Sequence, residues 1–316
     1  MTAKSLTVRY VNADESTQAP DSFLSRLVSK ATSRAVDIVR DSRVEVDVQF
    51  TSVQIGLKER LRRDYARGLR HLAPRRPDSL DARWASHNPL PQGRARSHVW
   101  FTGENVRPPV GPWDAYLSFD MDPFGGRNAY CPLWWWSLDL LGAPRSTFMD
   151  PAPSVETLLA HRTPGAHRPG FVAAFINNPD PMRMHMISLL KEVGPVDVFG
   201  GAVGRPVPNK VFAARDYKFV LCFENDLYPG YVTEKPIEAW ACGSVPIWWG
   251  LDPAGYVNPG AVINAATASN FEAVVSEVDS LAADEEAWAE MVSRPLLMRT
   301  PDLTDPVDLL SRTIGR

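Results

Sequence analysis

The chain has 316 residues, which is long for a single hydrophobic core and favours two domains of ordinary size. Apolar residues make up 44% of the chain and charged residues 22%, as is typical of soluble globular proteins. The formal net charge of -3 gives no overall attraction to a polyanion, so the composition argues against a nucleic-acid partner.

The sequence contains no apolar run of the length that a signal peptide or a membrane span needs, and we therefore expect a cytoplasmic protein. Three cysteines, Cys131, Cys222 and Cys242, follow none of the spacings that are typical of zinc sites. Cys222 and Cys242 lie within apolar runs, which favours buried free thiols in a reducing compartment.

The first half of the chain alternates between strand and helix patterns. The expected elements are a strand over 5–12, a helix over 21–40 with Asp21 as its N-cap, and strands over 44–50, 97–101 and 114–119. Alternation of this kind predicts a parallel α/β sheet, whose functional residues gather at the carboxyl ends of the strands.

Residues 142–170 are rich in proline, glycine and small side chains, a composition typical of an interdomain connection. Alternation then resumes. We expect strands over 171–177, 196–201, 217–225, 244–250 and 261–265, and helices over 180–194, 233–243 and 270–294. The fold class is therefore α/β, with two Rossmann-like domains that face a cleft. The expected division is a domain over 1–150, a linker over 151–170 and a domain over 171–316.

The segment "ENDLYPGYVTEKPIEAWACGSVPIWWG", residues 224–250, places many polar groups between two buried strands. Thr233 is a suitable N-cap, and Pro236 fits the first turn of a helix, so Glu234 and Lys235 would lie at a helix N-terminus. Such a terminus attracts anions, and the lysine would strengthen the attraction. On the pattern alone, a solvated helix start remains an alternative.

Residues 217–250 also closely resemble the donor-binding signature of the α-1,3/1,4-fucosyltransferases, family ten of the glycosyltransferases. The resemblance implies the GT-B architecture, with an N-terminal acceptor-binding domain and a C-terminal domain that binds the GDP-sugar donor. Carried over residue by residue, it implies that GDP-fucose is contacted by Asn225, Tyr231, Glu234 and Lys235. Further donor or acceptor contacts are expected from Glu224, Thr233 and Asn105.

Two shorter blocks extend this resemblance. Phe101–Asn105, "FTGEN", is similar to a family motif in the acceptor domain, and it makes Glu104 the expected general base for an acceptor hydroxyl. Residues 177–190, "NNPDPMRMHMISLL", resemble the segment in which an arginine faces the donor pyrophosphate, which is Arg183 here. The run "RNAY" before Cys131 departs from the family pattern, and this departure affects the acceptor half more than the donor half.

Two other features suggest different chemistry. Asp120 and Asp122 form an Asp-x-Asp pair like the metal motif of other glycosyltransferases, but Arg183 and Lys235 already supply charge for the leaving group. We therefore expect no essential metal, although a divalent ion can still stimulate the reaction. The basic run Lys58–Arg76 is interpreted as a solvated helix face, and peripheral contact with an anionic membrane is its alternative.

Together these features predict an inverting glycosyltransferase that moves L-fucose from GDP-fucose to a hydroxyl of an oligosaccharide or glycoconjugate acceptor, in an α-1,3-type linkage. No cofactor beyond this donor substrate and no nucleic-acid partner are expected. Two alternatives remain open. The same fold could use another GDP-hexose on a natural product or polysaccharide, or the chain could be a non-catalytic nucleotide-sugar-binding module. The sequence leaves the acceptor, the oligomeric state and the pathway open.

Overall fold

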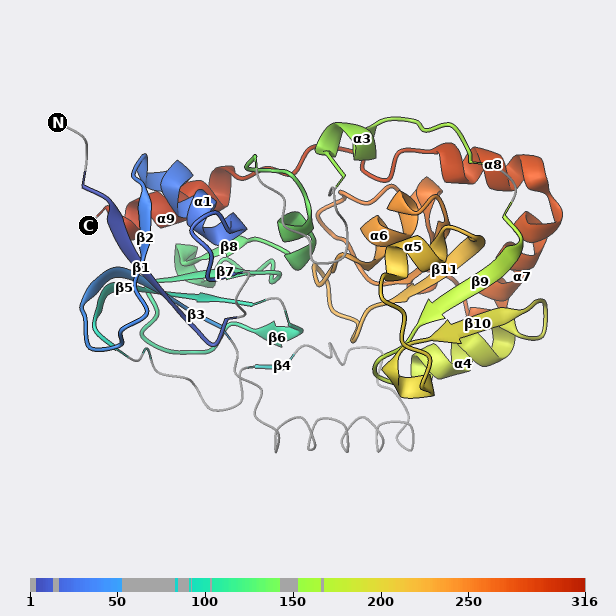
Figure 1. Cartoon of the computed structure of the whole chain (residues 1–316), viewed down its shortest axis with the longest axis horizontal. Coiled ribbons are helices and arrows are strands. Elements are labelled where there is room, and N and C mark those ends of the chain that lie inside the picture. Colours follow the sequence, from blue (N-terminus) through green and yellow to red (C-terminus); the bar gives the residue numbers. More distant parts are fainter. Residues whose placement is uncertain are drawn as a thin grey trace.

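The computed structural model describes residues 4–13, 17–52, 83–84, 91, 93–102, 104–142, 153–165 and 168–315. Two parallel sheets lie side by side along the long axis of the molecule, and helices pack on them (Figure 1). The expected α/β class, with two Rossmann-like halves, is confirmed.

The first sheet has six parallel strands in the order β2-β1-β3-β5-β7-β8. Their bounds are β1 Leu6–Val11, β2 Val36–Ile38, β3 Val46–Thr51, β5 Ala95–Phe101, β7 Ala115–Ser118 and β8 Asn128–Tyr130. Two short strands, β4 (Arg83–Trp84) and β6 (Val106–Arg107), form a separate pair. Val8, Val48 and Val99 are fully buried on neighbouring strands and form the middle of this core.

One helix of the first half is shorter than we expected. Helix α1 covers Phe23–Thr32, and its N-cap is Ser22 rather than Asp21, since the Ser22 hydroxyl accepts a hydrogen bond from the Ser25 amide. Ser33 then adopts a left-handed conformation with φ 56°, which ends the helix. The β-branched residues Val36 and Ile38 form β2 instead of a further helical turn, because such side chains suit a strand better.

The second sheet has five parallel strands in the order β10-β9-β11-β12-β13. Their bounds are β9 Gly170–Phe175, β10 Val196–Phe199, β11 Tyr217–Phe223, β12 Val245–Trp249 and β13 Ile263–Asn264. Side chains alternate between two cores, as the period of a strand requires. Phe219 and Leu221 pack on one face with the helices α4 (Pro181–Leu190), α7 (Phe271–Ala283) and α8 (Glu285–Ser293). Val220 and Cys222 pack on the other with α5 (Lys210–Ala214) and α6 (Lys235–Ala241).

The helix expected over 270–294 is two helices. Asp284 is the C-terminal cap of α7 and the N-cap of α8, and its carboxylate accepts hydrogen bonds from the amides of Glu286 and Ala287. An aspartate at this position ends one helix and starts the next, because its side chain satisfies the first amides of α8.

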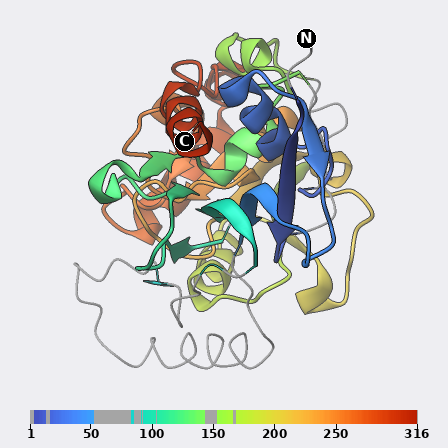
Figure 2. The same cartoon turned by 90° about the vertical axis from the view of Figure 1, so that its left-hand side faces the viewer.

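The end of the chain returns to the first sheet. Helix α9 (Thr304–Ile314) packs against α1 and β8, and Ser97 of β5 donates a hydrogen bond to the carbonyl of Thr313 (3.0 Å). Figure 2 shows α9 beside α1. In Figure 1, both ends of the chain lie near the first sheet. The short helix α3 (Val155–Leu159) lies on the connection between the halves. The expected boundaries at 150 and 171 remain a prediction, and α9 is a segment of the second half that contacts the first.

The two halves meet through buried aromatic rings. Phe119, after β7, makes edge-on contacts with Tyr228 and Tyr231 from the second half, at centroid distances of 5.6 and 5.1 Å. The Tyr130 hydroxyl donates to the carbonyl of Gly230 (3.3 Å). Gly230 has φ +89°, and a Cβ there would lie 2.3 Å from the Phe119 carbonyl oxygen, so only glycine fits this contact.

Candidate active site

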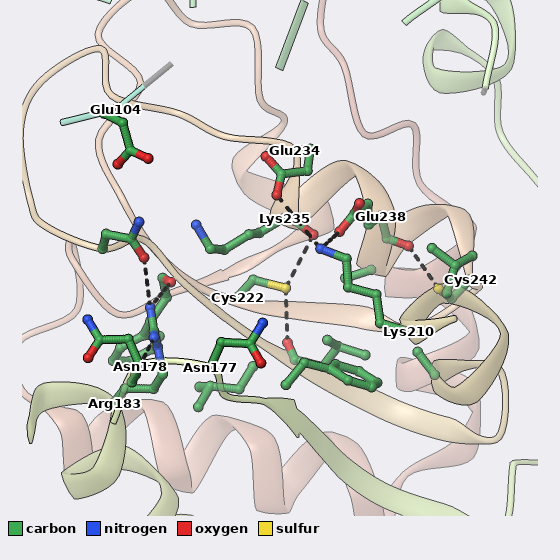
Figure 3. Close-up of a pocket in the computed structure, with 18 residues that line it drawn as sticks. Glu104, Asn177, Asn178, Arg183, Lys210, Cys222, Glu234, Lys235, Glu238 and Cys242 are labelled. Carbon is green, nitrogen blue, oxygen red and sulfur yellow. Dashed lines mark hydrogen bonds and ion pairs between the residues drawn. The ribbon is translucent and has the colours of Figure 1, made fainter. Parts of the chain in front are cut away.

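A cavity of about 400 Å³ lies at the carboxyl ends of β9 and β11. These adjacent strands form the switch point of the sheet, the place where the strand order reverses, since β10 lies beyond β9 and β12 lies beyond β11. Open α/β sheets bind ligands at this position. The cavity is lined mostly by the second half, and Glu104 reaches it from the first half (Figure 3). Its polar lining residues include Glu104, Asn177, Asn178, Arg183, Lys210, Asn225, Glu234, Lys235 and Glu238.

Glu224 is the anchor of the loop beside the cavity. Its carboxylate accepts hydrogen bonds from the Thr233 amide (2.9 Å), the Thr233 hydroxyl (2.6 Å) and the Lys235 ammonium (2.7 Å). The Glu224 side chain is fully buried, and the indole N–H of Trp248 also points to it at 3.4 Å. A buried carboxylate needs such partners, so Glu224 holds the loop rather than a ligand.

This arrangement corrects the expected helix cap. Helix α6 begins at Lys235, and Pro236 lies in its first turn as we expected, but the N-cap position is occupied by Glu234. The Thr233 hydroxyl points to Glu224 instead of capping the helix. Within the described residues, the Glu234 side chain makes no capping hydrogen bond to α6, and it lines the cavity.

Lys235 lies between its structural partner and the cavity. Its ammonium donates to Glu224 and to the Thr233 hydroxyl (2.9 Å). These contacts use two of its three N–H donors among the described residues, and the side chain is 25% exposed. The third donor can therefore serve an anionic ligand from a fixed position.

Arg183 lies in the first turn of α4, whose N-cap is Asp180. Its guanidinium donates to the carbonyl oxygens of Asn178 (3.0 Å) and Phe223 (2.8 Å), and it is only 6% exposed. The arginine thus ties the loop after β9 to the end of β11. It forms part of the cavity wall at the switch point. Its Nη2 lies 3.5 Å from Oδ1 of Asn225.

Glu104 comes from the first sheet. It follows β5, and its backbone is held by a hydrogen bond from its amide to the Thr102 hydroxyl (3.0 Å) and one from the Val106 amide to its carbonyl (2.7 Å). Its side chain is exposed and enters the cavity across from Glu234 and Lys235 (Figure 3). Asn105, the next residue, is not among the described residues that line the cavity.

Tyr231 lies in the aromatic contact between the halves. It is 2% exposed and packs against Phe119. Burial raises the pKa of its hydroxyl well above the usual range, and a hydrogen bond with the Asn225 side chain opposes this only in part. Tyr231 is not among the described residues that line the cavity, and it contacts the site only indirectly, through its hydrogen bond with the Asn225 side chain.

Lys210 and Glu238 are two cavity residues that the sequence reasoning missed. The Lys210 ammonium lies 2.5 Å from Oε2 of Glu238 and 3.7 Å from Oε1 of Glu234. Burial raises the pKa of Glu238 to about 7, although the neighbouring lysine favours the ionised form. The two residues are 28 positions apart on different helices, so no local spacing could have indicated the pair. Cys222 and Cys242 are buried free thiols, as we expected, and Cys131 is buried and free as well.

The Asp-x-Asp pair has a structural partner. Asp120 forms an ion pair with Arg107 (2.5 Å), and its Oδ1 accepts a hydrogen bond from the Asp122 amide (3.0 Å). In the part of the chain that the structure describes, no group of three metal-ligating side chains is found. The basic run Lys58–Arg76 lies outside the described residues. Among the described helices, none is long and apolar enough to cross a membrane.

Comparison with solved structures identifies the architecture. A crystal structure of an alpha1,3-fucosyltransferase matches with a TM-score of 0.68 and 24% identity, over 99% of this chain and 92% of that chain. A further structure, of alpha1,3-fucosyltransferase with GDP-fucose, matches with a TM-score of 0.64 and 22% identity over the same shares. The chain therefore has the GT-B fold of the glycosyltransferases.

Sequence comparison points to one family of glycosyltransferases. Residues 167–293 match the model described as glycosyltransferase family 10 (fucosyltransferase) C-term, so this part of the chain is similar to a family 10 domain. An alpha-(1,3)-fucosyltransferase FucT from Helicobacter pylori is 29% identical over 61% of this chain and 46% of its own length. The 3-galactosyl-N-acetylglucosaminide 4-alpha-L-fucosyltransferase FUT3 from Bos taurus is 30% identical over 53% of this chain and 44% of its own. The chain spans about half the length of the curated relatives it matches.

Proposed function

We propose that this protein transfers L-fucose from GDP-fucose to a hydroxyl group of a glycan acceptor, with inversion at the anomeric carbon. The observation that carries the proposal is one cavity at the switch point of a family 10 domain, which joins cationic residues of the second half to a carboxylate of the first. In this proposal residues 171–316 bind the donor, residues 1–150 bind the acceptor, and residues 151–170 connect them.

Glu104 is the proposed general base. The acceptor oxygen attacks the anomeric carbon of fucose, the bond from this carbon to the β-phosphate oxygen breaks, and the hydroxyl proton passes to the Glu104 carboxylate. GDP leaves on the opposite face. The carboxylate is suited to this step because it enters the cavity from the other sheet, across from the residues that we assign to the donor.

Lys235 and Arg183 are the proposed partners of the departing diphosphate. Lys235 is preorganised by Glu224, and the guanidinium of Arg183 is preorganised by backbone carbonyls at 2.8 and 3.0 Å. Fixed charges of this kind stabilise a leaving group without reorganisation during the reaction. We assign the ribose and fucose hydroxyls to Glu234 and Asn225. We propose Tyr231 as a support for Asn225 and thus for the donor.

The test is GDP release by the purified protein with GDP-fucose and a panel of galactose and N-acetylglucosamine acceptors. Release that depends on an acceptor and is lost in Glu104→Gln supports the proposal. A parallel assay with GDP-mannose decides between fucose and another GDP-hexose, and an arm with EDTA decides whether a divalent metal takes part. Donor binding without turnover for any acceptor would instead favour a non-catalytic binding module.

A further inference from the structure

The proposed function assigns no role to the most deeply buried carboxylate of the cavity. Glu238 is 5% exposed and lines the cavity from α6. Its Oε2 contacts the Lys210 ammonium at 2.5 Å, whereas its Oε1 is buried without a hydrogen-bond partner among the described residues. An unpaired buried carboxylate oxygen is costly, and a ligand that donates to it would remove this cost.

Lys210 and Glu238 lie at the end of the cavity opposite to Glu104 (Figure 3). A sugar that reacts at Glu104 and a diphosphate that lies at Arg183 and Lys235 leave the nucleoside to occupy this far end. The helices that carry this ion pair also contribute apolar side chains to the lining of the cavity, Val211 and Ala214 of α5 and Ala239 of α6. Such a slot suits the faces of a planar base, while the ion pair meets its edge.

We propose that Glu238 and Lys210 select guanine as the base of the nucleotide donor. In this arrangement Oε1 of Glu238 accepts a hydrogen bond from the exocyclic amino group, and Oε2 accepts one from N1–H. The Lys210 ammonium, which already contacts Oε2, donates to the neighbouring O6. The inference rests on the proposed GDP-sugar donor and names the residues that distinguish this donor from other nucleotide sugars.

Other bases do not match this pair. Adenine presents the lone pair of N1 to the carboxylate and an amino group to the ammonium, so both contacts become repulsive. Uracil presents one N–H between two carbonyl groups, and one of these carbonyls would face a carboxylate oxygen. Sites built around hydrogen bonds reject mismatched groups strongly, because their own buried polar atoms are left unpaired.

The test is titration calorimetry of the full chain with GDP, IDP, ADP and UDP. IDP lacks the exocyclic amino group and isolates the contact with Oε1. We expect the wild type to bind GDP about tenfold or more tightly than IDP, and about 100-fold or more tightly than ADP. Glu238→Gln should bring the GDP affinity towards that of IDP and should tighten the weak binding of ADP, because a neutral amide no longer repels the lone pair of adenine N1. The matched control is Glu234→Gln, which should weaken all four nucleotides alike because the ribose is common to them.

The outcomes separate this inference from the proposed function. If GDP binds and IDP and ADP bind equally well, or if Glu238→Gln keeps the wild-type preference, the base is not read here, and the donor cavity still stands. If no nucleotide binds to the wild type, the proposed donor fails, and the inference fails with it. The wild-type series decides the matter even if Glu238→Gln does not fold.

Discussion

The two halves of the molecule share a strand order but differ in what they place at the carboxyl edge of the sheet. In both sheets the second strand of the half lies at the edge, and the first strand lies next to it. The later strands then follow in order on the far side of the first strand. The second sheet surrounds its switch point with Glu224, Thr233, Lys235 and Arg183, which hold one another and the backbone. The first sheet contributes only Glu104 to the described lining of the cavity.

The shared topology therefore determines where a site can form, and the loops determine which residues it contains. In the proposed function, a diphosphate and its nucleoside need many fixed partners, which agrees with the anchored loop of the second half. The proposed proton acceptor needs only position, and the exposed Glu104 carboxylate after β5 meets that need. If this division is right, variants of the two halves should separate catalysis, stability and binding.

The largest effect is expected from Glu104→Gln. Loss of the proposed general base should lower kcat by about 10²–10⁴-fold, because a neutral amide cannot accept the hydroxyl proton. The affinity for GDP should stay within about twofold, since removal of a group that acts in the transition state leaves ground-state binding unchanged. Steady-state kinetics and calorimetry of the same preparation provide both numbers. A parallel loss of GDP affinity would break the division between the two halves.

The second prediction concerns Glu224→Ala. Its carboxylate is fully buried and paired with Lys235, and removal of one partner of such a pair costs about 3–5 kcal/mol of unfolding free energy. Denaturant unfolding measures this loss. A matched control is Glu290→Ala, since Glu290 forms an exposed pair with Arg294 at 2.7 Å, and such pairs contribute about 0.3–0.5 kcal/mol. Equal losses in both variants would show that the loop is not held by Glu224.

The sequence predicted the second half better than the first, for reasons that can be named. Strands such as β11 and β12 are long apolar runs that end at polar loops, and the motif around Glu234 and Lys235 lies on one continuous segment. The stretch after Thr32 mixes apolar and polar residues at a spacing that fits both helix and strand, and the left-handed Ser33 decides between them. Local patterns could not decide this end of α1.

The site was predictable where its residues lie in recognisable sequence motifs, and it was not where a residue's role depends on a distant partner. The Lys210–Glu238 pair joins two helices, and the position of Tyr231 depends on Phe119, more than a hundred residues earlier in the chain. Thr233 was expected as a cap because threonine favours that position, but the buried Glu224 binds its hydroxyl instead. Long-range partners of this kind override local preference.

The third prediction tests the contact between the halves through Gly230→Ala. A Cβ there meets the Phe119 carbonyl oxygen at 2.3 Å, so the two loops must separate. The matched control is Gly255→Ala, because Gly255 has φ +68° and no atom within 4 Å of the added Cβ. Left-handed strain of about 1–2 kcal/mol is common to both variants. Gly230→Ala should lose about 1–3 kcal/mol more, as overpacked sites do, and should lose turnover as well. Similar unfolding curves for the two variants would contradict a tight contact.

The smallest expected effect is the pH dependence of GDP binding. Burial raises the pKa of Glu238 to about 7, and the carboxylate must be ionised to accept hydrogen bonds from guanine. GDP affinity should therefore rise about tenfold per pH unit as pH approaches 7 from below, and it should level off above that value.

Stability of the ligand-free protein should change in the opposite direction. The pKa of Glu238 in the folded protein lies above the ordinary glutamate value of 4.5, so the stability linked to this carboxyl is complete below pH 4.5 and is lost as pH rises from 4.5 to about 7.

The charged groups that face Glu238 sharpen this test. Lys210 of α5 lies beside it, Glu234 and Lys235 act on it from the start of α6, and burial raises the pKa values of the Cys222 and Cys242 thiols so that both stay neutral in this range. The terminal phosphate of the nucleotide titrates near pH ~6, as a phosphoserine does, and ADP has the same phosphate. A rise in GDP affinity that ADP does not share, and that Glu238→Gln abolishes, assigns the titration to the base-reading carboxylate. Parallel curves for GDP and ADP would instead assign it to the terminal phosphate.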